Sequence, residues 1–264
     1  GLSYSSGLPL VPVHHLRSHI AANYLAHPDL APPFLCLVAS GGHSHLVEVE
    51  DYTRIRVLGR TRDDAAGECF DKIARVMGLG YPGGAPLDRA AQGGNDKAFS
   101  LPRVHIQDAP LDMSFSGLKT AMLNLIHNAQ QKGEELPVAD LAASFSAAVS
   151  EELVPRTMAA AQAKGYGKVA VVGGVAANSR IRRDLEQACQ AAGCTLYLPP
   201  LKLCGDNGSM IGSQGYYEYL AGTRAGTDLN AYANREISRP YGTGTAPVFP
   251  SPVEKSVESV HNSL

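Results

Sequence analysis

Short apolar and alternating runs in the first part of the chain predict strands rather than helices. Residues 34–50, FLCLVASGGHSHLVEVE, read as two strands joined by a Ser-Gly-Gly-His turn, and RIRVLGR at 54–60 predicts a third. Glycine suits the tip of such a turn because it tolerates backbone angles that other residues avoid. We therefore expect a hairpin that is extended by one further strand.

Longer segments carry apolar residues at the spacing of helices. Asp63 and Asp64 offer an N-cap for a helix that begins directly after them. A further helix is predicted over 113–128, and an alanine-rich helix over 140–164. Because proline lacks a backbone donor, Pro155 should kink or split this last helix.

The next segment alternates strand, helix and strand. A buried strand is predicted over 168–174, a helix over 178–193 and a second strand over 194–200, which together form a β-α-β unit. Asp206 then caps or directly precedes a helix that ends near Leu220. The whole pattern predicts a layered α/β fold.

Two histidines four residues apart, His15 and His19, are the first candidate for chemistry. A helix turns by about 100° per residue, so both rings lie on one face and can reach one metal ion. Two helix-surface histidines are the plain alternative. A zinc protease would have a glutamate as general base directly after the first histidine, where this chain has Leu16. A metal held by this pair would take a carboxylate as its third ligand.

Composition narrows the class of protein. The 264 residues, 44% of them hydrophobic, suit one large or two moderate globular domains, and no apolar run approaches the roughly 20 residues of a membrane helix. A net charge of −2 gives no global attraction to nucleic acid and leaves Arg180, Arg182 and Arg183 as the best local basic patch, unless they form an ordinary solvated helix face. Five scattered cysteines favour reduced thiols in the cytoplasm.

Three glycine-bearing turns could hold a nucleotide, since glycine lets backbone N–H groups approach a phosphate. They are SGGHS at 40–44, YPGGAP at 81–86 and VVGGVAANSR at 171–180. Asp71 and Asp88 could accept hydrogen bonds from ribose hydroxyls, and Asn178 could hold a base or phosphate edge. Ordinary tight turns, surface aspartates and a helix cap are the alternatives.

Six ordered motifs resemble those of the tRNA adenosine threonylcarbamoyltransferase family, TsaD, over residues 1–235. They are HHLRSH, SGGHSHL, DDAAGECFDKIARVMGLGYPGGAPLDR, MSFSGLKT, VVGGVAANSRIR and CGDNGSMIG. The resemblance implies a two-lobed α/β fold of the actin, Hsp70 and sugar-kinase (ASKHA, ribonuclease H-like) type. It also implies transfer of a threonylcarbamoyl group from threonylcarbamoyl-adenylate to N6 of adenosine 37 in tRNAs reading ANN codons, which forms t6A and releases AMP.

Site residues follow from the same resemblance. The metal ligands fall on His15, His19 and Asp206, with iron as Fe2+ the expected ion and zinc the alternative. The general base stays unknown, with His43 a candidate by its place in the turn. Many relatives carry an acidic residue where this chain has Arg17. The adenylate contacts fall on Val38, Ala39, Ser40, Gly41, Gly42, Asp71, Gly84, Asp88 and Asn178.

The resemblance also implies an organisation and partners. Residues 1–33 would be a remnant of the first lobe with the metal-binding helix, and 34–207 the second lobe with the adenylate loops. Residues 208–234 would return to the first lobe, and 235–264, rich in Pro, Gly, Ser and Thr, would be a flexible tail. Because the family's first strands would precede residue 1, we expect a truncated chain whose first lobe is incomplete.

The expected partners are tRNA, the adenylate, a paralogous subunit of the same fold and a small P-loop ATPase, without a membrane. Two other functions stay open at this point. One is a metalloprotease of the glycoprotease type, and the other is a non-catalytic, partner-binding paralogue. Metal content and adenylate binding would separate an enzyme from such a paralogue.

Overall fold

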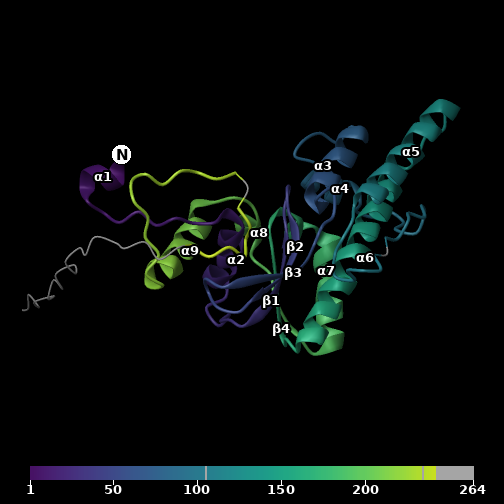
Figure 1. The fold of residues 1–264 in the computed structure, drawn as a ribbon. Helices are drawn as coiled ribbons and strands as arrows, with labels where there is room; N and C mark the ends of the chain where they lie inside the picture. Colours follow the sequence, from purple (N-terminus) through teal and green to yellow (C-terminus); the bar gives the residue numbers. More distant parts are fainter. Residues whose placement is uncertain (105, 234, 242–264) are drawn as a thin grey trace, which may run out of the picture.

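A mixed sheet forms the centre of the computed structural model, which describes residues 1–104, 106–233 and 235–241 (Figure 1). Its strands are β1 (Phe34–Ala39), β2 (Ser44–Val49), β3 (Ile55–Arg60), β4 (Lys168–Val172) and β5 (Thr195–Tyr197). They lie in the order β3-β2-β1-β4-β5, with β1, β2 and β3 antiparallel and β4 parallel to both β1 and β5. The predicted hairpin, third strand and β-α-β unit are confirmed.

Helices cover both faces of this sheet (Figure 1). They are α1 (Leu2–Ser6), α2 (His15–Ala26), α3 (Ala66–Val76), α4 (Gly84–Ala90), α5 (Ser116–Lys132), α6 (Val138–Lys164), α7 (Ser179–Ala192), α8 (Leu201–Cys204) and α9 (Gly208–Leu220), with a short 3-10 helix at Gly174–Ala177. None of these described helices combines the length and apolarity needed to cross a bilayer. The predicted split at Pro155 is wrong, because α6 continues through it while Leu153 and Val154 beside it pack into the core.

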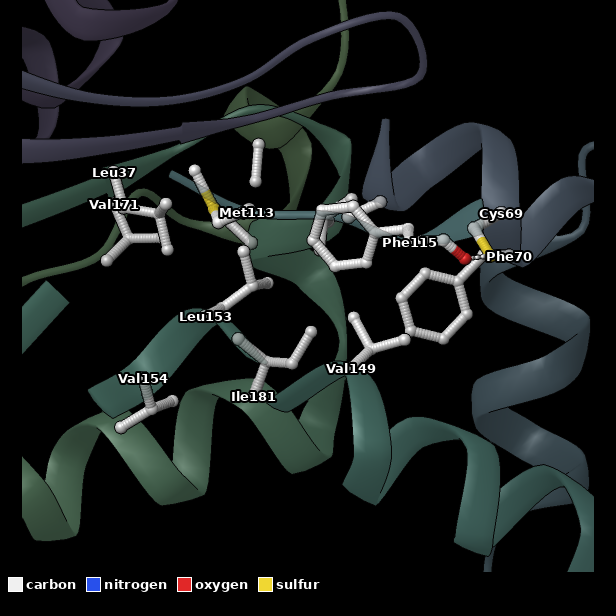
Figure 2. Packing of buried hydrophobic residues seen from close by; sticks show 14 of the residues in the cluster. Leu37, Cys69, Phe70, Met113, Phe115, Val149, Leu153, Val154, Val171 and Ile181 are labelled. Carbon is white, nitrogen blue, oxygen red and sulfur yellow. Dashed lines mark hydrogen bonds between the residues drawn. The ribbon is translucent and has the colours of Figure 1, made fainter. Parts of the chain in front are cut away.

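Side chains of β1 alternate between two hydrophobic clusters. Leu35, Leu37 and Ala39 belong to the cluster under α3, α5, α6 and α7, whereas the intervening residues of β1 face α2. Figure 2 shows the first cluster, in which Leu37 and its strand partner Val171 lie near Leu153 of α6. Because both faces are covered, β1 is apolar at every position.

Helices α2 and α9 pack side by side on the other face, although they are far apart in the sequence. The Ser213 hydroxyl of α9 donates a hydrogen bond to the Ala21 carbonyl of α2 at 2.9 Å. The ring of Tyr217 stacks on that of Tyr52, with centroids 4.0 Å apart, and Tyr24 of α2 contacts both rings edge-on. This pairing brings the residues just before α9 to the first turn of α2.

Asp63 and Asp64 do not cap the helix that follows them, because Ala65 is the N-cap of α3. Asp63 instead accepts hydrogen bonds from the backbone N–H groups of Phe115 (2.8 Å) and Ser116 (3.1 Å), at the start of α5. Burial opposes ionisation, but hydrogen bonds from two serine hydroxyls and these amides hold the pKa of Asp63 below its ordinary value. Asp64 pairs with two lysines. The aspartates therefore cap and brace a helix distant in sequence.

The predicted flexible tail begins too early at residue 235. Ile237 is 2% exposed, and Arg17 donates hydrogen bonds to the backbone carbonyls of Ile237 (2.8 Å) and Arg239 (3.0 Å). A buried guanidinium needs acceptors for its N–H groups, and this segment supplies them. Residues 235–241 are thus packed on α2, while 242–264, the rest of the predicted tail, lie outside the described residues.

Candidate functional site

The two adjacent histidines at the start of α2 have different surroundings. His14 is the N-cap, and its Nδ1 accepts a hydrogen bond from the Leu16 N–H at 3.2 Å. Its Nε2 lies 2.7 Å from the Arg235 carbonyl and donates to it. His15 and His19 project from one helix face, with ring centroids 4.8 Å apart. Sequence reasoning missed the cap, because histidine is not among the residue types that commonly cap helices.

Asp206 reaches these rings from the segment that precedes α9. Asn207 caps α9 by accepting the Met210 N–H at 2.9 Å, which leaves Asp206 just outside the helix, as predicted. Its Oδ1 lies 3.3 Å from Nε2 of His15 and 3.2 Å from Nε2 of His19. The ligand atoms of all three residues lie within 4.8 Å of one another. The structure therefore brings the three predicted ligands together.

The surroundings of these three side chains fit a metal ion. The His19 side chain is 2% exposed, and neither ring nitrogen makes a well-aligned hydrogen bond within the described residues. Burial, followed by the nearby His15, lowers the pKa of His19 and favours the neutral ring that binds metals. Bonds of about 2.1 Å at tetrahedral angles separate ligand atoms by about 3.4 Å, close to both nitrogen–oxygen distances.

The exposed side of this cluster leaves room for substrate atoms on a bound ion. The side chains of His15 and Asp206 are 51% and 73% exposed, so further coordination positions face solvent. Two imidazoles and one carboxylate suit iron or zinc. Leu16, 4% exposed, occupies the position at which a zinc protease helix carries its general base. The local geometry therefore favours a metal site of another kind.

The predicted adenylate turns meet at the carboxyl ends of β1 and β4. Gly173 ends β4 with a φ of 93°, and a Cβ there would lie 2.3 Å from the Ala39 carbonyl oxygen. Gly67, in the first turn of α3, would place a Cβ 2.5 Å from the Ser40 oxygen, and its N–H donates to that oxygen at 3.3 Å. Glycine at both positions lets these three segments pack closely.

Asp71, Asp88 and Asn178 join two further helix starts to this edge of the sheet. Asp71 accepts the Gly83 N–H at 2.6 Å, directly before α4. Asp88 of α4 accepts the Ser179 N–H at 3.0 Å and its hydroxyl at 2.8 Å, both through Oδ1. Asn178 caps α7 through Oδ1, as the plain alternative predicted, while its Nδ2 is buried without a hydrogen-bond partner among the described residues. That amide keeps a donor for a ligand.

The remaining predicted contacts differ in accessibility. Val38 and Ala39 are fully buried within β1, so Ser40, Gly41 and Gly42 form the accessible part of this stretch. A Cβ at Gly84 would meet nothing within 4 Å, so this glycine borders open space. Ligand contacts from these segments would therefore come from the turn itself and from the start of α4.

The arginines on α7 do not form a free basic patch. Arg180 pairs with Asp96 and with Asp184, the latter at 2.6 Å from Nε. Arg182 donates to two backbone carbonyls, and Arg183 lies 3.6 Å from Asp184. Because Arg180 and Arg182 are engaged within the protein, the predicted local attraction for nucleic acid is weak here.

Comparison with solved structures defines the class of fold. Full-length HypF in a phosphate- and nucleotide-bound form matches with a TM-score of 0.61 and 15% identity, over 83% of this chain and 37% of that one. HypF from T. kodakarensis matches with a TM-score of 0.64 and 18% identity, over 84% and 38%. The fold is therefore of the actin, Hsp70 and sugar-kinase type that the motifs implied.

Comparison with known sequences gives the family. The sequence model of the family described as TsaD, tRNA N6-adenosine threonylcarbamoyltransferase, matches residues 1–213. A protein of that name from Clostridium botulinum (strain 657 / Type Ba4) is 48% identical over 237 residues, or 90% of this chain and 70% of the relative. Another from Moorella thermoacetica is 51% identical over 230 residues, or 87% and 67%. The chain belongs to the TsaD family.

Proposed function

We propose that this chain transfers a threonylcarbamoyl group from threonylcarbamoyl-adenylate to N6 of adenosine 37 in tRNAs that read codons beginning with A. The observation that carries this proposal is the family match over residues 1–213. The clustered histidines and aspartate and the glycine turns support it, because the reaction must hold an adenylate and a reactive carbonyl together.

The chemistry is an acyl transfer at the carbamoyl carbon. The lone pair of N6 attacks this carbon, and the bond from the carbon to the phosphate oxygen breaks. The electron pair of that bond leaves with AMP, and the proton lost from N6 passes to water. The products are t6A and AMP, so the reaction needs no oxidant or reductant.

The adenylate would be held by groups that the protein leaves available. The exposed turn at Gly41 and Gly42 can direct N–H groups at the phosphate. Asp88 uses Oδ1 within the protein, which leaves Oδ2 to accept from a ribose hydroxyl. The buried Nδ2 of Asn178 can donate to a ring nitrogen of the base. Positioning by these contacts would supply much of the rate acceleration.

His15, His19 and Asp206 would hold one divalent ion, for which we propose iron as Fe2+, with zinc as the alternative. When bound, the ion would polarise a carbamoyl or phosphate oxygen as a Lewis acid. The surroundings of these residues support the proposal: His19 is buried with a lowered pKa, while His15 and Asp206 are exposed and leave one side of the cluster open.

The test uses the double variant His15→Ala plus His19→Ala. The matched control is a separate variant, His127→Ala, which removes an exposed histidine on α5. Metal content is measured by mass spectrometry, and t6A by liquid chromatography of tRNA nucleosides after incubation with the adenylate. The double variant should lose both metal and product, while the control keeps both. Full transfer and unchanged metal in the double variant would refute the metal assignment.

We further propose, from the family resemblance, that the chain acts with a paralogous subunit of the same fold and a small P-loop ATPase. The proposed location is the cytoplasm, which suits a tRNA substrate and five unpaired cysteines. Reconstitution with and without each candidate subunit tests the partners: turnover should depend on both. Equal turnover by the chain alone would contradict the proposed assembly.

A further inference from the structure

A cavity of about 420 Å³ lies directly beside the metal cluster. His14 and His15 at the start of α2 form one wall, and His43, the last residue of the Ser-Gly-Gly-His turn, forms the second. Residues 229–233, with Arg235 and Tyr241, form the third wall. The cavity thus shares His15 with the metal cluster and lies next to the turn that would hold the phosphate.

This cavity is separate from the expected adenylate contacts. Neither Ser40, Gly41 nor Gly42 lines it, and neither do the aspartates and Asn178 on the other turns. The cavity is connected to the metal cluster through His15 and to the Ser-Gly-Gly-His turn through His43. A second reactant placed here would lie beside His15 of the metal cluster and His43 of the turn.

The lining of the cavity suits an aromatic base. Tyr232 and Tyr241 offer two rings, and Tyr232 is 67% exposed and therefore accessible for stacking. The Arg235 guanidinium lies 4.6 Å from the Tyr241 ring centroid, and its Nε is a buried donor without a hydrogen-bond partner among the described residues. Such a donor can satisfy a ring nitrogen of a purine.

Charge and size point to the same class of ligand. No carboxylate lines the described part of the cavity, whereas Arg235 adds a fixed positive charge that favours an RNA backbone nearby. The volume lies near the lower end of the range for small-ligand sites. It can admit one nucleoside that has left its stack, but not a base-paired stem.

We propose that this cavity binds the acceptor base, an adenine extruded from a single-stranded RNA loop, with Tyr232 stacking on it and Arg235 donating to it. The proposal rests on the proposed function and specifies where that function takes its second substrate. It makes Tyr232 and Arg235 determinants of RNA affinity and leaves the binding of the adenylate to the glycine turns.

The experiment uses an anticodon stem-loop RNA with 2-aminopurine at the acceptor position. This base lacks the reacting amine at position 6, so the measurement reports binding without chemistry. Stacking quenches its fluorescence, and titration of the full chain should therefore produce quenching that saturates. Saturating AMP should leave this quenching in place, because the two ligands occupy different sites.

Matched variants separate the cavity from general effects. Tyr232→Ala should raise the Kd for the labelled RNA about tenfold or more, and Tyr232→Phe should restore it, because the ring does the stacking. Tyr4→Ala removes another exposed ring, on α1, and should have no effect. Arg235→Gln should weaken binding, whereas Arg239→Gln, which removes the same charge from an exposed position outside the lining, should not.

Equal quenching by all of these proteins would overturn the proposal, and so would loss of quenching on addition of AMP. Failure of the proposed function has a different signature, because the wild-type chain with the adenylate and its partners would then form no t6A on unlabelled tRNA. Formation of t6A with an unchanged KM for tRNA in Tyr232→Ala and Arg235→Gln would instead refute the cavity alone.

Discussion

Removal of the Arg17 guanidinium should destabilise the fold far more than loss of an ordinary surface charge. Arg17 is 1% exposed and stands between His15 and His19 in the sequence of α2. Its Nη1 lies 3.2 Å from Glu218, which is also 1% exposed, and its other donors bind the carbonyls of Thr53, Ile237 and Arg239. The substitution Arg17→Met keeps an apolar stem of similar length but deletes every one of these contacts.

The magnitude follows from what remains behind. Glu218 would keep hydrogen bonds from Gln214 (3.1 Å) and Thr223 (2.8 Å) but lose its countercharge in a buried position. An uncompensated buried charge of this kind costs about 3–5 kcal/mol. The buried carbonyl of Ile237 would also lose its donor. We expect Arg17→Met to lower the free energy of unfolding by about 3–5 kcal/mol, a large fraction of the stability of a typical domain.

Urea denaturation of a double-mutant cycle measures this effect. The cycle comprises Arg17→Met, Glu218→Leu and the double variant, and the double variant should be more stable than the sum of the single effects predicts. Arg54→Met is the matched control, because Arg54 is 70% exposed and pairs with Asp51 at 3.8 Å. Its expected effect is about 0–1 kcal/mol.

Two results would contradict the expected role of Arg17. One is a loss below about 1 kcal/mol for Arg17→Met, which would mean that the guanidinium is solvated in solution. The other is additivity of the two single effects within about 0.5 kcal/mol, which would mean that the two side chains do not interact.

Three further predictions address other contacts. Asp63→Asn should lower the free energy of unfolding by about 1 kcal/mol at pH 7, because it weakens the cap of α5. Since the folded pKa of Asp63 is lowered, the difference from wild type in urea denaturation should disappear as the pH falls below about 4. A difference that stays constant with pH would contradict this. Burial, followed by His43 and Arg60, lowers the pKa of His45 from 6.5 to about 4. As the pH falls through that window, the free energy of unfolding should drop by up to about 2–3 kcal/mol more in wild type than in His45→Gln. Parallel pH profiles of the two proteins would disprove this prediction. Gly67→Ala should lower both the melting temperature and the affinity for AMP in equilibrium dialysis, because its Cβ would lie 2.5 Å from the Ser40 oxygen. Gly84→Ala, whose Cβ meets no protein atom within 4 Å, should lower only the affinity for AMP. Normal AMP binding by both variants would argue against these turns as the adenylate site.

Much of the secondary structure could be predicted because it depends on local patterns. The hairpin, the strand at 54–60 and the β-α-β unit follow from apolar runs bounded by glycine and proline, and the structure confirms them. The placement of Asp206 directly before α9 was likewise a local inference. The split at Pro155 was wrong, since the packing of α6 over the sheet outweighs one missing backbone hydrogen bond.

The amino-acid sequence was enough to place His15 and His19 on one helix face, because four residues are slightly more than one helical turn. The ordered motifs indicated Asp206 as their partner. The way in which these residues meet depends on packing between distant helices: α9 packs along α2, and Asp206, directly before α9, comes within 3.3 Å of both rings. The same holds for Arg17, whose burial could not be predicted from its neighbours. Its acceptors come from three distant segments, and a charge becomes favourable inside a protein only when packing supplies such partners.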